Sequence, residues 1–235
     1  MGIYQCTYKK GYDLKDYFNR QIQLWGEEKQ FSLQDKTIVI IGSGGLGSSL
    51  SIPLGSSGIG TIYMVDFDTV SLTNIHRQIA FRMEDIDKNK ADVVCKLLRD
   101  RCPFVNAIPK VMDFDAFTKE DIKVDLIIDA TDNLPTRKKI DEFAKKSATP
   151  WLYGSVEEFN GQVCFFDKAS FDVFKITDRK PGGIAAPIVM NIASFQANVA
   201  LRYLADLPIE KDLLHYFYFN EAGNFELQKF NLPKS

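Results

Sequence analysis

The sequence predicts an α/β fold with a doubly wound, mostly parallel sheet that a few antiparallel strands continue near the C-terminus. Three observations support this class. Short apolar segments alternate with helix-like segments from residue 30 to about residue 150. The first apolar segment, KTIVIIG, runs directly into the glycine-rich turn GSGGLG. Near Glu157 the alternation stops and hairpin-like segments begin, so we expect a Rossmann-like sheet with an antiparallel extension.

Five strands are predicted in the first part, because each segment is short, apolar and bounded by polar or turn residues. They cover residues 36–42, 60–68, 107–114, 124–133 and 149–156. Helices are predicted after Gly44, over 88–103 and over 134–147. Pro53 falls inside the first of these helices, and proline removes a backbone donor there. We therefore expect a bend at Pro53 or a helix that starts later than Gly45.

The second part has a different pattern. Residues 158–167 predict a strand that follows an Asn160-Gly161 turn. Residues 189–207 predict a long helix, and residues 213–232 predict a hairpin around Glu-Ala-Gly-Asn. We expect three regions: an N-terminal helical segment (1–29), a nucleotide-binding part (30–155), and the antiparallel strands and helix of the same domain (156–235).

Composition argues against two classes of partner. The 235 residues carry a formal net charge of -2, which gives no electrostatic basis for binding nucleic acid. No stretch approaches the roughly 18 apolar residues of a membrane span, and the N-terminus lacks the apolar run of a signal peptide. We therefore expect a cytoplasmic protein with no nucleic-acid or membrane partner.

The four cysteines are expected to pack in the core. They are Cys6, Cys95, Cys102 and Cys164, and no two of them form a Cys-x-x-Cys pair. Cys95 and Cys102 lie on one face of a predicted helix. Because the chain has only two histidines, no zinc site is predicted.

The glycine-rich turn predicts a nucleotide site. Gly42, Gly44 and Gly47 match the pattern G-x-G-x-x-G after a strand. The first glycine permits the turn, the second lets the backbone approach a phosphate, and the third lets helix and strand pack closely. Asp66 ends the second strand, where an acid can accept ribose hydroxyls. The motif suits NAD as well as ATP, and a glycine turn that only permits tight packing is the structural alternative.

Charged residues near the predicted strand ends favour ATP. A dinucleotide's pyrophosphate can be held by backbone N–H groups, whereas chemistry on a triphosphate requires cations and a carboxylate that holds a metal. The candidates are Arg20 before the first strand, Asn74 and Arg77 after the second, Lys90 at the start of the next helix, and Asp129, Asp132 and Asn133 after the fourth strand. Taken singly, Arg20 and Lys90 fit a solvated surface, and Asp132-Asn133 fits a helix N-cap.

Four segments in this order resemble the MoeB/ThiF/HesA family, bacterial relatives of the ubiquitin-activating enzymes. They are YFNRQIQLWG, GSGGLG, DFDTVSLTNIHRQ and ATDN, and the resemblance covers roughly residues 17 to 205. It implies an ATP- and Mg²⁺-dependent adenylyltransferase that activates the C-terminal glycine carboxylate of a small ubiquitin-like sulfur-carrier protein ending in Gly-Gly. It also implies a homodimer. The pathway would be molybdopterin or thiamine biosynthesis.

The resemblance also implies roles for single residues. The expected nucleotide contacts are Gly42, Gly44, Gly45, Gly47, Asp66, Asp68, Asn74, Arg77, Lys90, Asp132 and Asn133. Among these, Asp66 would hold the ribose and Asp132 the magnesium ion. The expected catalytic residues are Arg20, Arg77, Lys90 and Asp132, with Arg20 reaching across the dimer to the partner's ATP.

The sequence departs from the family in two places. Many members bind a structural zinc with two Cys-x-x-Cys pairs; both pairs are missing here, and we expect packing by Phe171, Val173 and Phe174 to replace the metal. Many members also carry a thioester-forming cysteine before a GG..AP segment, and TDRKPGGIAAP has none. We therefore expect an activator that stops at the acyl-adenylate, with sulfur supplied by another protein.

Three alternatives stay open. One is adenylation of another acid, such as a tRNA base or a peptide. The second is an NAD-dependent oxidoreductase, and the third is a scaffold subunit that has kept the fold without the activity.

Overall fold

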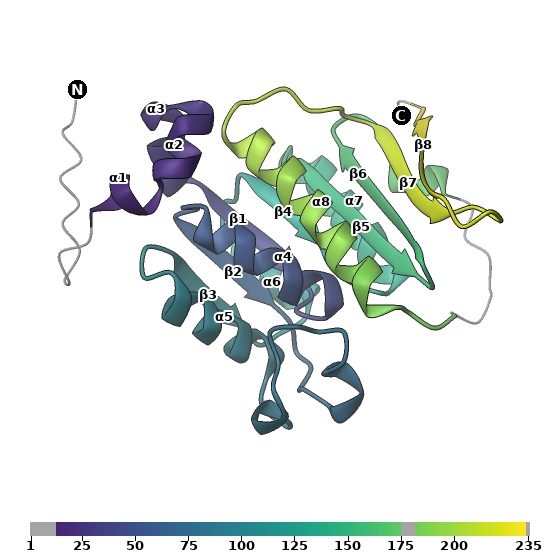
Figure 1. The fold of residues 1–235 in the computed structure, drawn as a ribbon, viewed down its shortest axis with the longest axis horizontal. Helices are drawn as coiled ribbons and strands as arrows, with labels where there is room; N and C mark the ends of the chain where they lie inside the picture. Colours follow the sequence, from purple (N-terminus) through teal and green to yellow (C-terminus); the bar gives the residue numbers. More distant parts are fainter. Residues whose placement is uncertain (1–12, 175–181, 234–235) are drawn as a thin grey trace.

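The computed structural model describes residues 13–174 and 182–233 (Figure 1). Its core is one sheet of eight strands in the order β3-β2-β1-β4-β5-β6-β7-β8. The strands are β1 Thr37–Ile41, β2 Thr61–Val65, β3 Asn106–Lys110, β4 Leu126–Asp129, β5 Trp151–Glu157, β6 Asn160–Phe166, β7 Leu213–Phe219 and β8 Phe225–Asn231. The first five are mutually parallel and the last three pair antiparallel. The predicted fold class is confirmed.

Helices cover both faces of the parallel part of the sheet. One face carries α4 Gly45–Ser56, α5 Lys90–Arg101 and α8 Ala186–Leu204, and the other carries α6 Phe114–Thr118 and α7 Leu134–Ser147 (Figure 1). Alternate residues of β1 therefore join two separate cores: Ile38 and Ile40 pack in one, and Val39 and Ile41 in the other. A strand buried on both faces must be apolar throughout, which explains the run TIVII.

Shorter elements complete the chain. Between residue 13 and β1 the structure has three helices, namely α1 Leu14–Tyr17, α2 Asn19–Trp25 and α3 Glu27–Ser32. The 3₁₀ turns are η1 Leu33–Asp35, η2 Leu72–Asn74, η3 Met83–Asp85 and η4 Phe171–Val173. In the described ranges no helix is long and apolar enough to cross a membrane.

The register of the sheet brings three strand ends to one edge. Ile41 at the end of β1 pairs with Val65 at the end of β2 and with Asp129 at the end of β4. The chain order reverses here, because β2 and β4 lie on opposite sides of β1. Ligands of open α/β sheets bind in the crevice at such a switch point. The residues that follow these three strands therefore form the place to look for a site.

Helix α4 begins at Gly45, so of the two outcomes expected because of Pro53 the later start is wrong, and the bend stays a prediction. The helix also continues past the proline to Ser56. Pro53 removes one backbone hydrogen bond, but Leu46, Leu50 and Leu54 are buried along the same helix. Burial of this apolar stripe outweighs the lost bond.

The turn between β5 and β6 also differs from the prediction. Glu157 pairs with Asn160, so the two turn residues are Glu158, with φ 54°, and Phe159. Gly161 lies inside β6, where a Cβ atom would overlap the side chain of Ile192 on α8. The glycine is required for close packing of helix on sheet, which the Asn-Gly dipeptide cannot reveal in the sequence.

The described cysteines pack in the core as expected. Cys95, Cys102 and Cys164 are free and buried, although Cys102 caps α5 rather than lying inside it. Burial raises the pKa of Cys95 to about 12 and raises that of Cys164 as well. Cys6 lies outside the described residues. In the part of the chain that the structure describes, no three His, Cys, Asp or Glu side chains gather as they would around a metal ion.

Aromatic side chains pack around residues 171–174, the segment expected to stabilise the fold in place of the zinc ion that many family members bind. Phe171 is buried, and its ring centroid lies 5.1 Å from that of Phe174 and 5.9 Å from that of Trp151. Val173 is only partly buried and belongs to neither core. That this packing replaces a metal stays a prediction.

Candidate nucleotide site

The glycine loop between β1 and α4 is built for close backbone contact. Gly42 has φ 96°, and a Cβ atom there would lie 2.7 Å from the carbonyl oxygen of Ala130. Gly44 is the N-cap of α4 but offers no side chain to cap it. The first N–H groups of a helix have no partner within the helix, and they carry its positive dipole end. The loop therefore presents donors suited to a phosphate.

Asp66 ties this loop to the end of β2. Its Oδ2 accepts a hydrogen bond from the Ser43 N–H at 2.6 Å, and its Oδ1 accepts one from the Asp68 N–H at 2.8 Å. Burial raises the pKa of the Asp66 carboxyl, while these N–H donors and the charge of Lys90 act against the rise. Each carboxylate oxygen keeps a second lone pair, so the side chain can still accept a hydrogen bond from a hydroxyl group.

Lys90 points into the molecule, unlike a typical surface lysine. Its side chain is 9% exposed, and its Nζ lies 2.9 Å from Oδ2 of Asp68. Its backbone N–H also donates to the carbonyl oxygen of Asp68, at 3.0 Å. Two contacts therefore hold the start of α5 against the loop that follows β2, and the ammonium group lies near Asp66. The predicted site residues Asp66, Asp68 and Lys90 are brought together.

The segment 74–77 lies against the start of α4. The carbonyl oxygen of Arg77 lies 3.9 Å from the position that a Cβ of Gly45 would take. The Arg77 guanidinium donates to the carbonyl oxygen of Thr73 at 2.7 Å and lies 2.9 Å from Nε2 of His76. Asn74 accepts from the Ser71 N–H at 3.1 Å. Arg77 thus lies near the start of α4, and the side chains of both predicted residues are engaged in their own turn.

The end of β4 carries a buried ion pair that the sequence reading missed. Nε of Arg137 lies 3.0 Å from Oδ2 of Asp129, and its NH2 group donates to the carbonyl oxygens of Thr131 and Gly154 at 2.6 and 3.1 Å. Asp129 also accepts two hydrogen bonds from Thr131. A buried acid at the end of an apolar strand needs such a cation, and this is the signal that could have located Arg137.

The turn held by this pair displays Asp132. The Asp132 side chain is exposed and makes no hydrogen bond or ion pair with any residue in the described ranges. Asn133 instead caps α7, because its Oδ1 accepts from the Thr136 N–H at 2.9 Å. The N-cap explanation therefore holds for Asn133, while Asp132 is free to hold a cation.

Arg20 is remote from the loop within one chain. It is exposed on α2, and Gln23 is its hydrogen-bonding partner, at 3.5 Å. The adjacent Gln21 donates to the carbonyl oxygen of Ser57, at the far end of α4 from the glycine loop. Twelve helical residues span about 18 Å, so the structure does not bring Arg20 to the other predicted residues.

Helix α8 supports both sides of the site. A Cβ on Gly45 would lie 2.9 Å from Cγ1 of Val189, so the start of α4 packs directly on α8. On the same helix, Nε2 of Gln196 donates to the carbonyl oxygen of Asp129 at 3.0 Å. The glycine loop and the end of β4 therefore rest on one element.

Two further polar side chains near the loop, those of Gln78 and Ser43, were not predicted as site residues. Gln78 is 5% exposed and its Oε1 has no hydrogen-bond partner. The Ser43 hydroxyl is buried without a partner as well. The Ser43 hydroxyl and the open helix N–H groups can donate to phosphate oxygens, and the exposed Asp132 carboxylate suits a metal ion. Gln78 follows Arg77 directly, but sequence alone does not show its burial.

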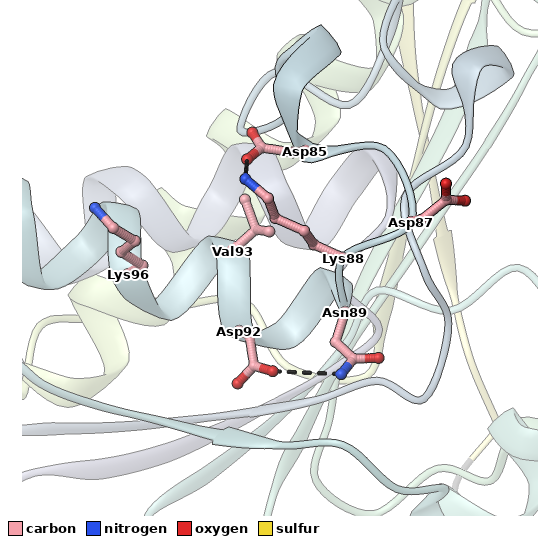
Figure 2. Close-up of a pocket in the computed structure, with 7 residues that line it drawn as sticks. All are labelled: Asp85, Asp87, Lys88, Asn89, Asp92, Val93 and Lys96. Carbon is pink, nitrogen blue, oxygen red and sulfur yellow. Dashed lines mark hydrogen bonds and ion pairs between the residues drawn. The ribbon is translucent and has the colours of Figure 1, made fainter.

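A surface hollow elsewhere does not belong to this site. It is lined by Asp85, Asp87, Lys88, Asn89, Asp92, Val93 and Lys96, near the start of α5 (Figure 2). Asp85 pairs with Lys88 at 2.9 Å, and Asn89 donates to Asp92 at 3.4 Å (Figure 2). Lys96 pairs with Asp100 outside the hollow, and none of the lining residues is a predicted site residue.

Residues 18–235 match the profile described as the ThiF family. The chain belongs to the ThiF family. The predicted resemblance is thereby confirmed. The sulfur carrier protein ThiS adenylyltransferase of Escherichia coli K12 is 29% identical over 208 residues, which cover 83% of this chain and 82% of that protein. The adenylyltransferase and sulfurtransferase MOCS3 of Dictyostelium discoideum is 30% identical over 198 residues, covering 77% of this chain and 46% of that protein.

This ThiF-family chain spans about half the length of some of these relatives. It covers 46% of the MOCS3 protein of Dictyostelium discoideum and 51% of that of Caenorhabditis briggsae. Among solved structures, E. coli MccB with ATP superposes with a TM-score of 0.82 at 18% identity, covering 94% of this chain and 72% of that one. At this identity the likeness shows the fold.

Proposed function

We propose that this chain is an ATP-dependent adenylyltransferase that activates the C-terminal glycine carboxylate of a ubiquitin-like sulfur-carrier protein ending in Gly-Gly. The observation that carries the proposal is the arrangement around the glycine loop: open helix N–H groups, the inward-pointing Lys90, and the exposed Asp132, whose side chain makes no hydrogen bond in the described ranges. Membership of the ThiF family, and relatives named as adenylyltransferases of sulfur carriers, support the same activity.

The reaction suits these residue types. A carboxylate oxygen attacks the α-phosphorus of ATP, a new P–O bond forms, and the bond to pyrophosphate breaks. Because the carboxylate is already ionised near neutral pH, no proton has to be removed first. Both reactants are anionic, so the main barrier is repulsion, which Lys90 and Arg77 would reduce. Histidine is not needed for this chemistry.

Individual residues take complementary roles in this proposal. The N–H groups at the start of α4 hold a phosphate, and Asp66 accepts a ribose hydroxyl. Asn74, Arg77 and Lys90 hold the remaining phosphate oxygens. Asp132 binds Mg²⁺, which screens the phosphate charge when it is present.

Arg20 is proposed to complete the site of a partner subunit in a homodimer. Helix α2 carries no buried residue, and the Arg20 side chain extends from it into solvent. Within its own chain it lies toward the opposite end of α4 from the loop. A second copy of the chain would therefore supply the arginine.

Sulfur transfer is assigned to another protein. The three described cysteines are buried, and burial raises the pKa of Cys95 and Cys164, so these thiols are poor nucleophiles. The stretch 177–187, where family members carry a thioester cysteine, lies partly outside the described residues and has no cysteine in its sequence. We propose that the chain releases the carrier as an acyl-adenylate, in molybdopterin or thiamine biosynthesis.

ATP–pyrophosphate exchange tests this function directly. Each small Gly-Gly-ending carrier from the same organism is added in turn, and radiolabel moving from pyrophosphate into ATP is measured. Exchange that depends on one carrier supports adenylation and identifies the substrate. ATP binding without exchange with any carrier would contradict the proposed substrate, and thermal stabilisation by NAD but not by ATP would contradict the proposed enzyme class.

A further inference from the structure

Gln78 is a buried polar residue whose side chain has no partner in the described chain. It is 5% exposed, and its Oε1, an acceptor, is enclosed without a hydrogen-bond partner among the described residues. Its backbone N–H and carbonyl oxygen are satisfied in the turn that follows η2. Gln196 also has an enclosed Oε1 without a partner, so the orphaned acceptor alone does not identify a ligand. What points to one is the position of the Nε2 donor of Gln78 beside the glycine loop.

Another buried glutamine shows how this fold treats a purely structural amide. Gln30 is fully buried, accepts a hydrogen bond from Nε1 of Trp25 at 3.1 Å and donates one to the carbonyl oxygen of Ser57 at 2.9 Å. Both ends of its amide are therefore used. Gln30 lies at the C-terminal end of α4, whereas Gln78 lies at the N-terminal end, where the glycine loop is.

The donor end of Gln78 faces the glycine loop. A Cβ atom on Gly44 would lie 3.5 Å from Nε2 of Gln78 and 4.0 Å from its Cδ. Gly44 is the N-cap of the 12-residue helix α4 and makes no side-chain cap bond. The neighbouring Ser43 hydroxyl is buried and has no partner either. Two unpartnered polar side chains thus flank the place where the helix N–H groups are open.

We propose that Gln78 is an additional phosphate-binding residue, whose amide N–H donates to a phosphate oxygen of the nucleotide bound at the start of α4. The inference rests on the proposed use of ATP. A phosphate is favoured over the base because the helix N–H donors that follow Gly44 suit an anion.

Two substitutions of equal length separate this role from a structural one. Gln78→Met keeps the volume and removes both polar atoms, and Gln78→Glu keeps the shape but replaces the donor with a negative charge. The affinity for ATP and for adenosine is measured by titration calorimetry, and the melting temperature is measured without ligand. Gln30→Met is the matched control, because it removes a buried amide that has both of its partners.

We expect Gln78→Met to weaken ATP binding about tenfold or more, as loss of a hydrogen bond to a charged group does. Adenosine affinity and the ligand-free melting temperature should stay unchanged, because no internal hydrogen bond is lost. Gln78→Glu should bind ATP more weakly still. Gln30→Met should show the opposite pattern: a lower melting temperature and unchanged ATP affinity.

Three outcomes would overturn the proposal. They are wild-type ATP affinity in Gln78→Met, wild-type ATP affinity in Gln78→Glu, and an equal loss of ATP and adenosine affinity in Gln78→Met. Failure of the proposed role of Gln78 can be distinguished from failure of the proposed adenylation, because these titrations contain no carrier protein. Carrier-dependent exchange with unaffected Gln78 variants would remove the role of Gln78 and leave adenylation standing.

Discussion

Arg137 and Asp129 form a buried ion pair behind the site, with 3.0 Å between Nε and Oδ2 and side chains that are 6% and 0% exposed. Burial acts to lower the pKa of Arg137, but the adjacent Asp129 charge raises it above the usual value. The same guanidinium holds the Thr131 carbonyl oxygen, so the pair fixes the turn that presents Asp132. Its consequences for stability and for activity can be tested separately.

Removing the arginine should strongly destabilise the protein. Arg137→Met leaves a buried carboxylate without its cation, which costs about 3–5 kcal/mol in comparable cases. Urea unfolding measures this loss. Lys139→Met on the same helix is the control: its ion pair with Asp115 is half-exposed on both sides, and such pairs contribute about 1 kcal/mol or less. Equal effects of the two substitutions would contradict the assignment.

Asp132→Asn should abolish carrier-dependent exchange while leaving the fold intact. The carboxylate makes no hydrogen bond to a described residue, so its replacement removes no internal contact. Losing a group that stabilises charge in the transition state costs about 10²–10³ in rate. Exchange rate and melting temperature are measured together, with Asp100→Asn on the surface of α5 as control. Near wild-type exchange would show that Asp132 does not hold the metal.

Two inactive variants should complement each other if Arg20 acts across a dimer. A heterodimer of Arg20→Ala and Asp132→Ala has one site with both residues intact. Random mixing should therefore restore about a quarter of wild-type activity, since half of the dimers are mixed and each has one working site. Activity is followed after refolding the variants together. Lack of rescue despite proven subunit exchange would place Arg20 within its own chain or outside the reaction.

Asp66 should give a distinctive pH dependence of stability. Burial raises its pKa from the usual 3.8, so the ionised form is less favoured in the folded than in the unfolded chain. Its contribution to stability is therefore fully present below the unfolded pKa and is lost as pH rises through the folded pKa. Relative to Asp66→Asn, wild type should gain stability on acidification. Urea unfolding of both proteins across acidic pH measures this, and a relative loss for wild type would mean that the pKa is lowered.

The arrangement of strands and helices could be predicted because it depends on periodicity. The apolar run of β1 indicates a strand that is buried on both faces. The amphipathic pattern of α5 indicates a helix that is buried on one face. The glycine loop could be located because its spacing reflects local backbone geometry. The Glu158-Phe159 turn could not, since Gly161 serves contact with Ile192, a residue distant in sequence.

The site was only partly predictable for the same reason. Asp66, Lys90 and Asp132 follow strand ends or begin a helix, so topology alone gathers them. The pairing of Asp129 with Arg137 and the isolation of the Gln78 amide depend on which side chains meet across elements. Residue types do not determine which side chains come into contact, because the chain contains many acids, cations and amides that could pair equally well.

Helix α8 touches the glycine loop through Val189 and the end of β4 through Gln196. These residues are seven apart, two turns along one face of the helix. Both parts of the candidate site therefore pack on the same helix, so ordering of one part can order the other. A nucleotide that orders the glycine loop would also order much of the turn after β4. A ligand that binds at that turn afterwards would then lose less conformational entropy.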